Sequence, residues 1–199
     1  MSNETYRQFD PWRPSPVKET SRHQIAKTHY FSIDRVSYES NDGGEFDRYC
    51  LYGNVGDTVG VLALTEDGMI PLVEQYRLAS HRWTLEIPGG HAVDSAEPTQ
   101  DLAKRKLVEE GGYEAGRITQ FARFLNTPSY STQHTSLYLA TDLTPAKRQE
   151  IGPETPRSEV RLTSVDDAYQ MVLNGTIVDA KTIIAILRLK SGSLMQLND

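Results

Sequence analysis

Residues 86–115 read EIPGGHAVDSAEPTQDLAKRKLVEEGGYEA, and they combine a glycine turn, a helix and a pair of carboxylates. The Pro-Gly-Gly at residues 88–90 interrupts an apolar run, so the backbone turns tightly there. Pro98 suits the first position of a helix, because a missing N–H costs nothing at that position. The glycine pair at residues 111–112 favours a helix end. We therefore expect one helix between Pro98 and this glycine pair.

Glu109 and Glu110 belong to the last turn of this expected helix. Adjacent carboxylates beside backbone carbonyls are typical of a site for a hard cation such as Mg²⁺, which also uses phosphate oxygens of a substrate. The alternative is a solvated acidic helix end, which is the commoner place for a pair of charged side chains. The two glutamates alone do not decide between a cation site and a charged surface.

The spacing of the whole stretch resembles the signature of the Nudix hydrolases, which cleave nucleoside diphosphates linked to another group. A glycine and a short loop precede Glu97, seven residues separate it from Arg105, and an aliphatic residue and Glu109-Glu110 follow. The loop before Glu97 is one residue longer than in the family pattern, a change that loops tolerate. The resemblance covers residues 27–190.

Lys106 departs from the family pattern, which has a glutamate there as a principal metal ligand. One unit charge at ~5 Å in an effective dielectric of ~20 is worth ~3 kcal/mol, so an ammonium there opposes metal binding. Two arrangements would still admit the ion: either Lys106 swings away on its flexible stem, or Glu97, Glu109 and Glu110 regroup around the ion. Alternatively, Lys106 pairs with Glu110 for only ~0.3 kcal/mol, and the site is a remnant.

Residues 74–77 (EQYR) and 83–90 (WTLEIPGG) resemble the ADP-ribose pyrophosphatase and nucleotide-sugar branch of the family. The resemblance implies that Arg77 grips a diphosphate or ribose, for which its planar fork is suited. The alternative for Arg77 is a surface ion pair. Glu86 would accept a ribose hydroxyl or complete the metal shell. Trp83 would stack on an adenine, or it belongs to the core.

The resemblance also implies a divalent cation, Mg²⁺ or Mn²⁺. Its expected ligands come from the glycine turn and the glutamates near it: the Gly89 carbonyl, Glu86, Glu109 and Glu110. Glu109 and Glu110 are also the expected catalytic carboxylates of the helix. A base that orients or deprotonates water is expected near the polar segment 147–158, with Glu154 and Glu159 as candidates; the alternative is a solvated loop glutamate.

Gln133 lies in a loop, residues 126–133, that resembles a Ser-Pro-Gly…Glu word of the ADP-ribose branch. Pro128 matches this word, whereas Gln133 stands where the family has a glutamate. We expect Gln133 to line the substrate site. The lost carboxylate leaves open whether ADP-ribose itself is the substrate.

The composition limits the functional classes. A net charge of −6 and a pI of 5.4 argue against a general nucleic-acid or anionic-membrane binder. No apolar run reaches membrane-spanning length. Cys50 is the only cysteine and the N-terminus lacks the apolar region of a secretion signal, so we expect a reducing, cytoplasmic compartment.

The expected fold is α+β: the Nudix fold, an α/β/α sandwich around a mixed sheet, with an N-terminal antiparallel hairpin. Alternation at residues 27–39 and 46–52 around an Asn-Asp-Gly-Gly turn predicts the hairpin. Further expected strands are 58–64, 69–76, 118–125, 136–140 and 159–162, with helices after Ser164 and from Asp179. The expected ranges are an extended arm at 1–26, the Nudix domain at 27–190 and a tail at 191–199.

We expect a hydrolase that cleaves the diphosphate of a nucleoside diphosphate linked to a sugar or similar group, ADP-ribose-like and slowed or altered by Lys106. The alternatives are a non-catalytic nucleotide or nucleotide-sugar binding protein on the same fold and a purely structural dimer with a decayed pocket. The expected partner is a small nucleoside diphosphate derivative. By analogy with the branch, we also expect a homodimer.

Overall fold

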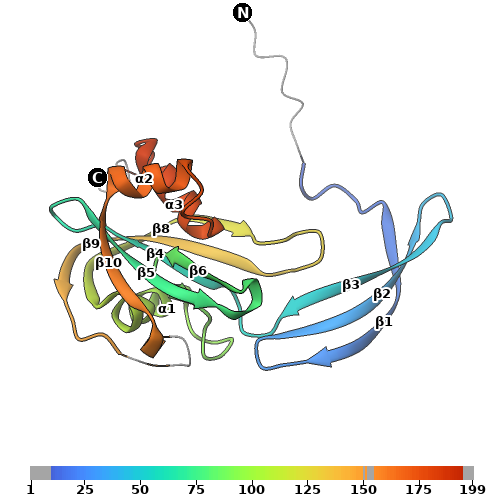
Figure 1. Ribbon diagram of the computed structural model, residues 1–199. Helices are drawn as coiled ribbons and strands as arrows, with labels where there is room; N and C mark the ends of the chain where they lie inside the picture. The colour runs from blue at the N-terminus through green and yellow to red at the C-terminus, as the bar shows by residue number, and fades with distance from the viewer. Residues whose placement is uncertain (1–9, 150, 152–154, 195–199) are drawn as a thin grey trace, which may run out of the picture.

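The computed structural model describes residues 10–149, 151 and 155–194. In this part of the chain the strands form three sheets, and helices cover the body of the molecule on two sides (Figure 1). Helices α2 and α3 lie on one side of the central strands, and α1 lies on the other (Figure 1). The expected α+β sandwich around a mixed sheet is confirmed.

The N-terminal sheet projects from the body as a wing (Figure 1). It consists of β1 (Val17–Lys27), β2 (Phe31–Ser40) and β3 (Glu45–Gly53), paired antiparallel in that order. The expected hairpin is therefore present as β2 and β3. Residues 17–26, part of the range expected as an arm, form most of β1, the third strand of this sheet.

The central sheet has the order β7-β4-β9-β8, from β7 (Gly89–Gly90), β4 (Thr58–Ala63), β9 (His134–Pro145) and β8 (Tyr113–Leu125). Its strands β4 and β9 run parallel, whereas β8 and β9 are antiparallel. All six residues of β4 are buried, as expected for a strand covered on both faces.

A second sheet of the body has the order β10-β5-β6, from β10 (Glu159–Ser164), β5 (Met69–Arg77) and β6 (Arg82–Glu86). Both strand pairs are antiparallel. A short 3₁₀ turn, η1 (Leu78–Ser80), joins β5 to β6, and another, η3 (Thr155–Arg157), precedes β10. Arg77 pairs with Arg82 and Glu86 pairs with Val73, so the two residues lie at opposite ends of the β5–β6 ladder and on the same face of the sheet.

Helix α1 (Thr99–Lys106) continues into a π-helical turn, η2 (Leu107–Gly111), which ends at Gly112 with a φ of 75°. The expected helix up to the glycine pair is confirmed, but its last turn is wider than an α-helical turn. Leu102 and Leu107 are fully buried beneath β4, where they pack with Val59 and Val61. Complete burial of such a leucine contributes about 1.5–3 kcal/mol.

Helices α2 (Val165–Leu173) and α3 (Ala180–Lys190) begin where the sequence predicted. Ser164 Oγ accepts from the backbone N–H of Asp167, and Asp179 caps α3 through the N–H of Thr182. Ile186 of α3 packs into a second core cluster with Leu62 and Leu72. Val61 and Leu62 thus pack into different core clusters, because successive residues of a strand point to opposite faces of the sheet.

The domain ranges expected from the sequence stay predictions. Leu194, from the expected tail, is fully buried in the core cluster of α2 and α3. No helix among the described residues is long and apolar enough to cross a membrane.

Candidate functional site

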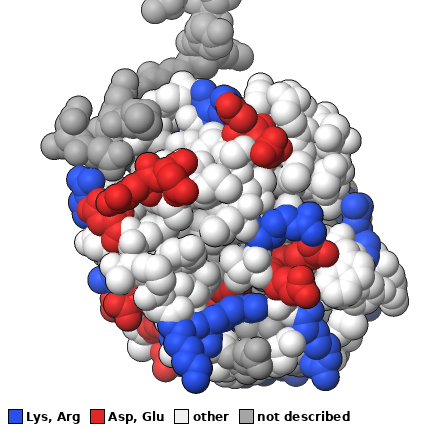
Figure 2. All heavy atoms as spheres, turned by 60° about the vertical axis from the view of Figure 1, so that its left-hand side comes forward, with Lys and Arg blue, Asp and Glu red and all other residues white. Residues whose placement is uncertain are grey.

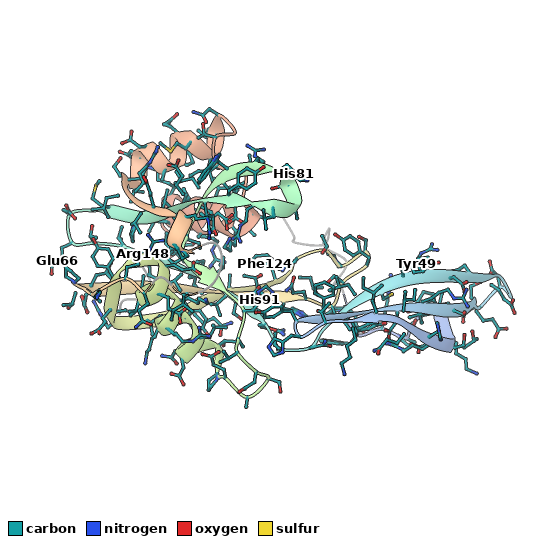
Figure 3. The ribbon with its side chains drawn as sticks, turned by 60° about the horizontal axis from the view of Figure 1, so that its bottom comes forward. Tyr49, Glu66, His81, His91, Phe124 and Arg148 are labelled. Atoms are coloured by element: carbon teal, nitrogen blue, oxygen red, sulfur yellow. The ribbon has the colours of Figure 1, made fainter. Side chains whose placement is uncertain are left out.

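A cleft of about 330 Å³ opens where β4, the glycine turn and the start of α3 meet. Its lining includes Arg77, Gly90, His91, Phe124 and Lys181. Figure 3 shows His91 and Phe124 where the body meets the base of the wing, whereas Tyr49 lies out on the wing. Residues from distant parts of the sequence therefore converge on this cleft.

Glu86 is the centre of one wall. Its carboxylate accepts hydrogen bonds from Arg77 Nε at 2.7 Å and Nη2 at 2.5 Å, and from Thr84 Oγ1 at 2.7 Å. Lys181 Nζ donates to the same carboxylate and also lies 2.9 Å from Asp179 Oδ1. The Glu86 side chain is 2% exposed. These bonds hold two cations side by side at the cleft.

The electrostatics of this cluster follow from its contacts. Burial by itself raises the pKa of Glu86, but the hydrogen bonds and charges of Arg77 and Lys181 outweigh burial and lower that pKa to about 2. The hydrogen bond to Glu86 also raises the pKa of Arg77. Glu86 is thus an ionised carboxylate that positions cations at neutral pH.

The glycine turn brings the backbone close to β4 and to the last turn of the helix. A Cβ at Gly89 would lie 2.3 Å from the carbonyl oxygen of Val59, so only glycine fits there. The Gly89 N–H donates to Glu110 Oε2 at 3.0 Å. Burial raises the pKa of Glu110, although this hydrogen bond and the nearby cations oppose the rise.

Lys106 points into the carboxylate cluster. Its Nζ lies 2.8 Å from Glu109 Oε2 and 3.6 Å from Glu110 Oε1. A Cβ at Gly90 would lie 2.8 Å from Lys106 Cε, so the lysine stem lies against the glycine turn. Lys106 therefore does not extend away from the carboxylates but pairs with them, and it lies closer to Glu109 than to Glu110.

Arg105 ties the start of the motif to its end. Its Nε and Nη2 each lie 2.8 Å from the carboxylate of Glu97, and its Nη1 lies 2.9 Å from Glu109 Oε1. Glu97 also accepts from the N–H of Val93 at 2.9 Å. The pKa of Glu97 is lowered mainly by the Arg105 hydrogen bonds. Arg105 therefore holds the loop and the helix together.

These carboxylates do not fit a divalent cation in the arrangement described. Glu97 forms hydrogen bonds to Arg105, and Glu86 forms an ion pair with Arg77. The Lys106 ammonium lies between Glu109 and Glu110. Among the described residues, no three Asp, Glu, His or Cys side chains group so that they could hold a metal ion. Mg²⁺ is usually held by one or two carboxylates, and the positive charge of an ammonium beside those carboxylates opposes its binding.

The opposite wall is a chain of neutral polar side chains. Thr58 Oγ1 lies 2.6 Å from Thr135 Oγ1, which donates to Asn126 Oδ1 at 2.7 Å. Asn126 Nδ2 donates to Gln133 Oε1 at 3.1 Å, and Gln133 Nε2 lies 3.0 Å from His91 Nε2. Burial, followed by the charges of Lys106 and Arg77, lowers the pKa of His91. This wall offers hydrogen bonds without charge.

The structure places Trp83 and Glu159 outside the cleft lining. Trp83 is 56% exposed and packs edge-to-face on Tyr76 at 5.7 Å, so it is not a core residue. Glu159 is exposed at the start of β10, opposite Glu74. Glu154 lies outside the described residues.

The segment that contains Glu154 begins beside the motif. The Gln149 N–H donates to the carbonyl of Glu109 at 3.3 Å, and Arg148 Nη1 donates to the carbonyl of Ser158 at 2.8 Å. Figure 3 labels Arg148 near the centre of the body. These bonds bring the two ends of the segment near the last turn of the helix.

Several cleft residues were not predicted from the sequence, among them His91 and Lys181. His91 follows the glycine turn directly, which was its available signal. Lys181 lies in the first turn of α3, where a cation opposes the helix macrodipole. A lysine at this unfavourable position signals a nearby carboxylate, which the structure identifies as Glu86.

Charges are compensated locally beyond the cleft as well. Figure 2 shows basic side chains next to acidic ones on the face in view. Arg161 pairs with Glu74 at 2.5 Å, and Lys190 pairs with Asp166 at 2.7 Å. These exposed pairs contribute little to stability, because solvent screens them.

Comparisons with known proteins agree with the fold and the motif. The family model described as the NUDIX domain matches residues 55–185. The chain is 33% identical over 184 residues to an ADP-ribose pyrophosphatase of Bacillus subtilis (strain 168), covering 90% of this chain and 98% of that protein. It is 30% identical over 128 residues to a methanol dehydrogenase activator of Bacillus methanolicus, covering 64% of this chain and 69% of that one.

A solved structure described as the crystal structure of an ADP compounds hydrolase has the same fold. Its TM-score is 0.76 at 18% identity, and the match covers 92% of this chain and 96% of that chain. At this identity the likeness concerns the fold alone. The chain therefore belongs to the Nudix family, in which it resembles the ADP-ribose pyrophosphatase branch.

Proposed function

We propose that this chain binds nucleoside diphosphates of the ADP-ribose class in the cleft and hydrolyses their diphosphate slowly. The observation that carries the proposal is the pair of cations, Arg77 and Lys181, held side by side on Glu86 at the cleft. The similarity to proteins named ADP-ribose pyrophosphatase supports the same class of ligand.

Arg77 is the main phosphate ligand in this proposal. Two of its donor nitrogens bond to Glu86, and its side chain is 42% exposed. A guanidinium has five N–H donors in a planar fork, so donors remain for phosphate oxygens. Lys181 adds a second positive charge, and the start of α3 presents the positive end of a helix to the same cleft.

The neutral wall would hold the rest of the ligand. Gln133, Asn126 and His91 offer amide and imidazole groups that bond ribose hydroxyls or base edges. Such groups fix the orientation of a ligand, whereas cations supply attraction for its diphosphate. Trp83 lies outside the cleft lining, so we do not assign it to base stacking.

In the reaction, water adds across the phosphoric anhydride and leaves two phosphate monoesters. With ADP-ribose these products are AMP and ribose 5-phosphate. Arg77 and Lys181 would bind the negative charge that develops on the phosphate oxygens. Glu154 and Glu159 remain the proposed candidates for the base. Glu109 and Glu110 keep their proposed role as catalytic carboxylates of the motif.

Use of a divalent cation, Mg²⁺ or Mn²⁺, for turnover is what the similarity to the family implies. The expected ligands were the Gly89 carbonyl, Glu86, Glu109 and Glu110, but the carboxylates among them bond to cations of the chain itself. We therefore derive no step through a metal. Lys106 among the carboxylates supports low turnover, and it also supports the second candidate function, a nucleotide-sugar binding protein without turnover.

The homodimer and the cytoplasmic location also remain proposals. The wing supports a dimer, because Tyr49 is 61% exposed on it. A second copy could cover this surface. The lone Cys50 supports a reducing compartment.

The proposed function is tested with ADP-ribose, sugar nucleotides and dinucleotides, with product analysis by chromatography and binding by calorimetry. Arg77→Ala should weaken binding of ADP-ribose at least about tenfold, because it removes a charge-assisted phosphate contact. Arg161→Ala is the matched control, since Arg161 forms an exposed ion pair with Glu74 on the neighbouring strand. Equal affinity of both variants, or no binding of any compound, would refute the proposal. Binding without products would establish the second candidate.

A further inference from the structure

Lys106 occupies the carboxylate cluster instead of avoiding it. Its ammonium lies 2.8 Å from Glu109 and 3.6 Å from Glu110, and its side chain is 17% exposed. A lysine that had only replaced a lost metal ligand would extend its ammonium into solvent, because its side chain has several rotatable bonds. The lysine is instead held within the site.

The close contact between Gly90 and Lys106 also indicates that the lysine is held within the site. A Cβ at Gly90 would approach Lys106 Cε to 2.8 Å and Cδ to 3.3 Å. The lysine stem therefore fills the space that the absent side chain leaves. Gly90 itself lines the cleft, so the lysine lies directly behind part of the cleft wall.

The charge of the ammonium equals that of a metal-loaded glutamate. A glutamate contributes −1 and a divalent cation +2, so together they carry +1, as a lysine does. Glu109 and Glu110, the other acidic residues of the cluster, are both present. Lys106 thus gives the cluster the local charge that a glutamate at position 106 would give only together with a bound divalent metal ion.

We infer that the Lys106 ammonium is a built-in cation of this site, so that the chain binds the diphosphate of its ligand without a divalent metal ion. This inference rests on the proposed function for the identity of the ligand. An ammonium has three N–H donors; Glu109 at 2.8 Å takes one of them, whereas Glu110 at 3.6 Å lies beyond hydrogen-bond distance. The ammonium can therefore attract a phosphate group while it stays on Glu109.

The first test compares ADP-ribose binding to the wild-type protein by calorimetry in EDTA and in Mg²⁺. We expect the two dissociation constants to agree within about twofold, a negligible difference in free energy. Lys106→Glu should bind at least about tenfold more weakly in EDTA, because a repulsive charge replaces an attractive one, and Mg²⁺ should restore its binding.

The second test needs no nucleotide. Mn²⁺ is titrated into each protein and free Mn²⁺ is followed by electron paramagnetic resonance. We expect Lys106→Glu to bind Mn²⁺ and the wild type not to bind it in the same concentration range. Lys104→Glu is the matched control, because Lys104 lies on the same helix, undergoes the same charge change and is exposed. It should behave as the wild type in both tests.

The outcomes separate this inference from the proposed function. Wild-type binding of ADP-ribose that requires Mg²⁺ would overturn the inference and leave the proposed function intact. Absence of ADP-ribose binding under both conditions would overturn the proposed function, and the Mn²⁺ titration would still decide the role of Lys106. Mn²⁺ binding by the wild type as tight as by Lys106→Glu would overturn the inference. Circular dichroism establishes that each variant is folded; if Lys106→Glu is not, the two wild-type measurements decide.

Discussion

Replacing Glu86 by glutamine removes the carboxylate on which one cleft wall is built. Glu86 is 2% exposed and accepts from Arg77, Thr84 and Lys181. Removing one partner of a buried ion pair costs about 3–5 kcal/mol. Arg77 is 42% exposed and regains solvation, which reduces this cost. We therefore expect Glu86→Gln to lower the free energy of unfolding by about 3 kcal/mol at pH 7.

The pH dependence of the free energy of unfolding gives a second value for the contribution of Glu86 to stability. The pKa of Glu86 falls from 4.5 to about 2, since the bonds to Arg77 and Lys181 outweigh the opposing effect of burial. A lowered pKa in the folded state stabilises the fold above the unfolded value, and this contribution is lost as the pH falls toward 2. The shift corresponds to about 3 kcal/mol at neutral pH, of which about 2 kcal/mol is lost by pH 3.

The assay is urea-induced unfolding of the wild type and of Glu86→Gln at pH 7 and at pH 3. Other acidic groups titrate in both proteins, so the difference between the two pH dependences isolates Glu86. The wild type should lose about 2 kcal/mol more than the variant between these pH values. Glu74→Gln is the control for loss of a carboxylate from the same sheet, because Glu74 is one-third exposed in a surface ion pair with Arg161 and should change the free energy of unfolding at pH 7 by less than about 1 kcal/mol. Equal losses in the wild type and Glu86→Gln, with equal denaturant slopes, would refute the reasoning.

Three further predictions concern the core, the turn and the neutral wall. Leu102→Ala should lower the free energy of unfolding by about 2–5 kcal/mol, whereas Leu173→Ala, at a 59% exposed position, should change it by less than about 0.5 kcal/mol. Chemical denaturation measures both values, and similar values for the two variants would contradict the packing of α1. Gly89→Ala would bring a Cβ to 2.3 Å from the Val59 carbonyl, so we expect a lower melting temperature and weaker ADP-ribose binding, and an unchanged melting curve would contradict the tight turn. Gln133→Ala should weaken ADP-ribose binding about threefold to tenfold without lowering the melting temperature, and calorimetry that shows equal affinity would exclude Gln133 from the site.

The sequence predicted the fold well where local chemistry determines it. Ser164 and Asp179 cap helices through hydrogen bonds to residues three positions away, so short stretches of sequence contain the whole signal. Alternation around the turn at residues 41–44 likewise predicted β2 and β3. Strand β1 was missed because nearly all of its side chains are exposed, which leaves no apolar alternation to detect.

The candidate site was predictable in part. The spacing of Glu97, Arg105 and Glu109 indicated a family, and Arg105 indeed joins the two glutamates. The sequence could not show which carboxylates already have cations. Lys181 reaches Glu86 across a separation of 95 residues, and only the packing of α3 against β4 and β9 brings them together.

Charge balance around the cleft explains how a diphosphate could enter a site whose cations are already paired. Arg77 and Lys181 share Glu86, and Lys106 stays on Glu109, so each cation is held in place before a ligand arrives. A held cation loses little conformational entropy on binding, because its side chain is already ordered. A diphosphate therefore needs only the unused N–H donors of these groups and does not have to displace Glu86. Glu86 is therefore a positioning residue, whose removal should weaken ligand binding even though its carboxylate repels the ligand.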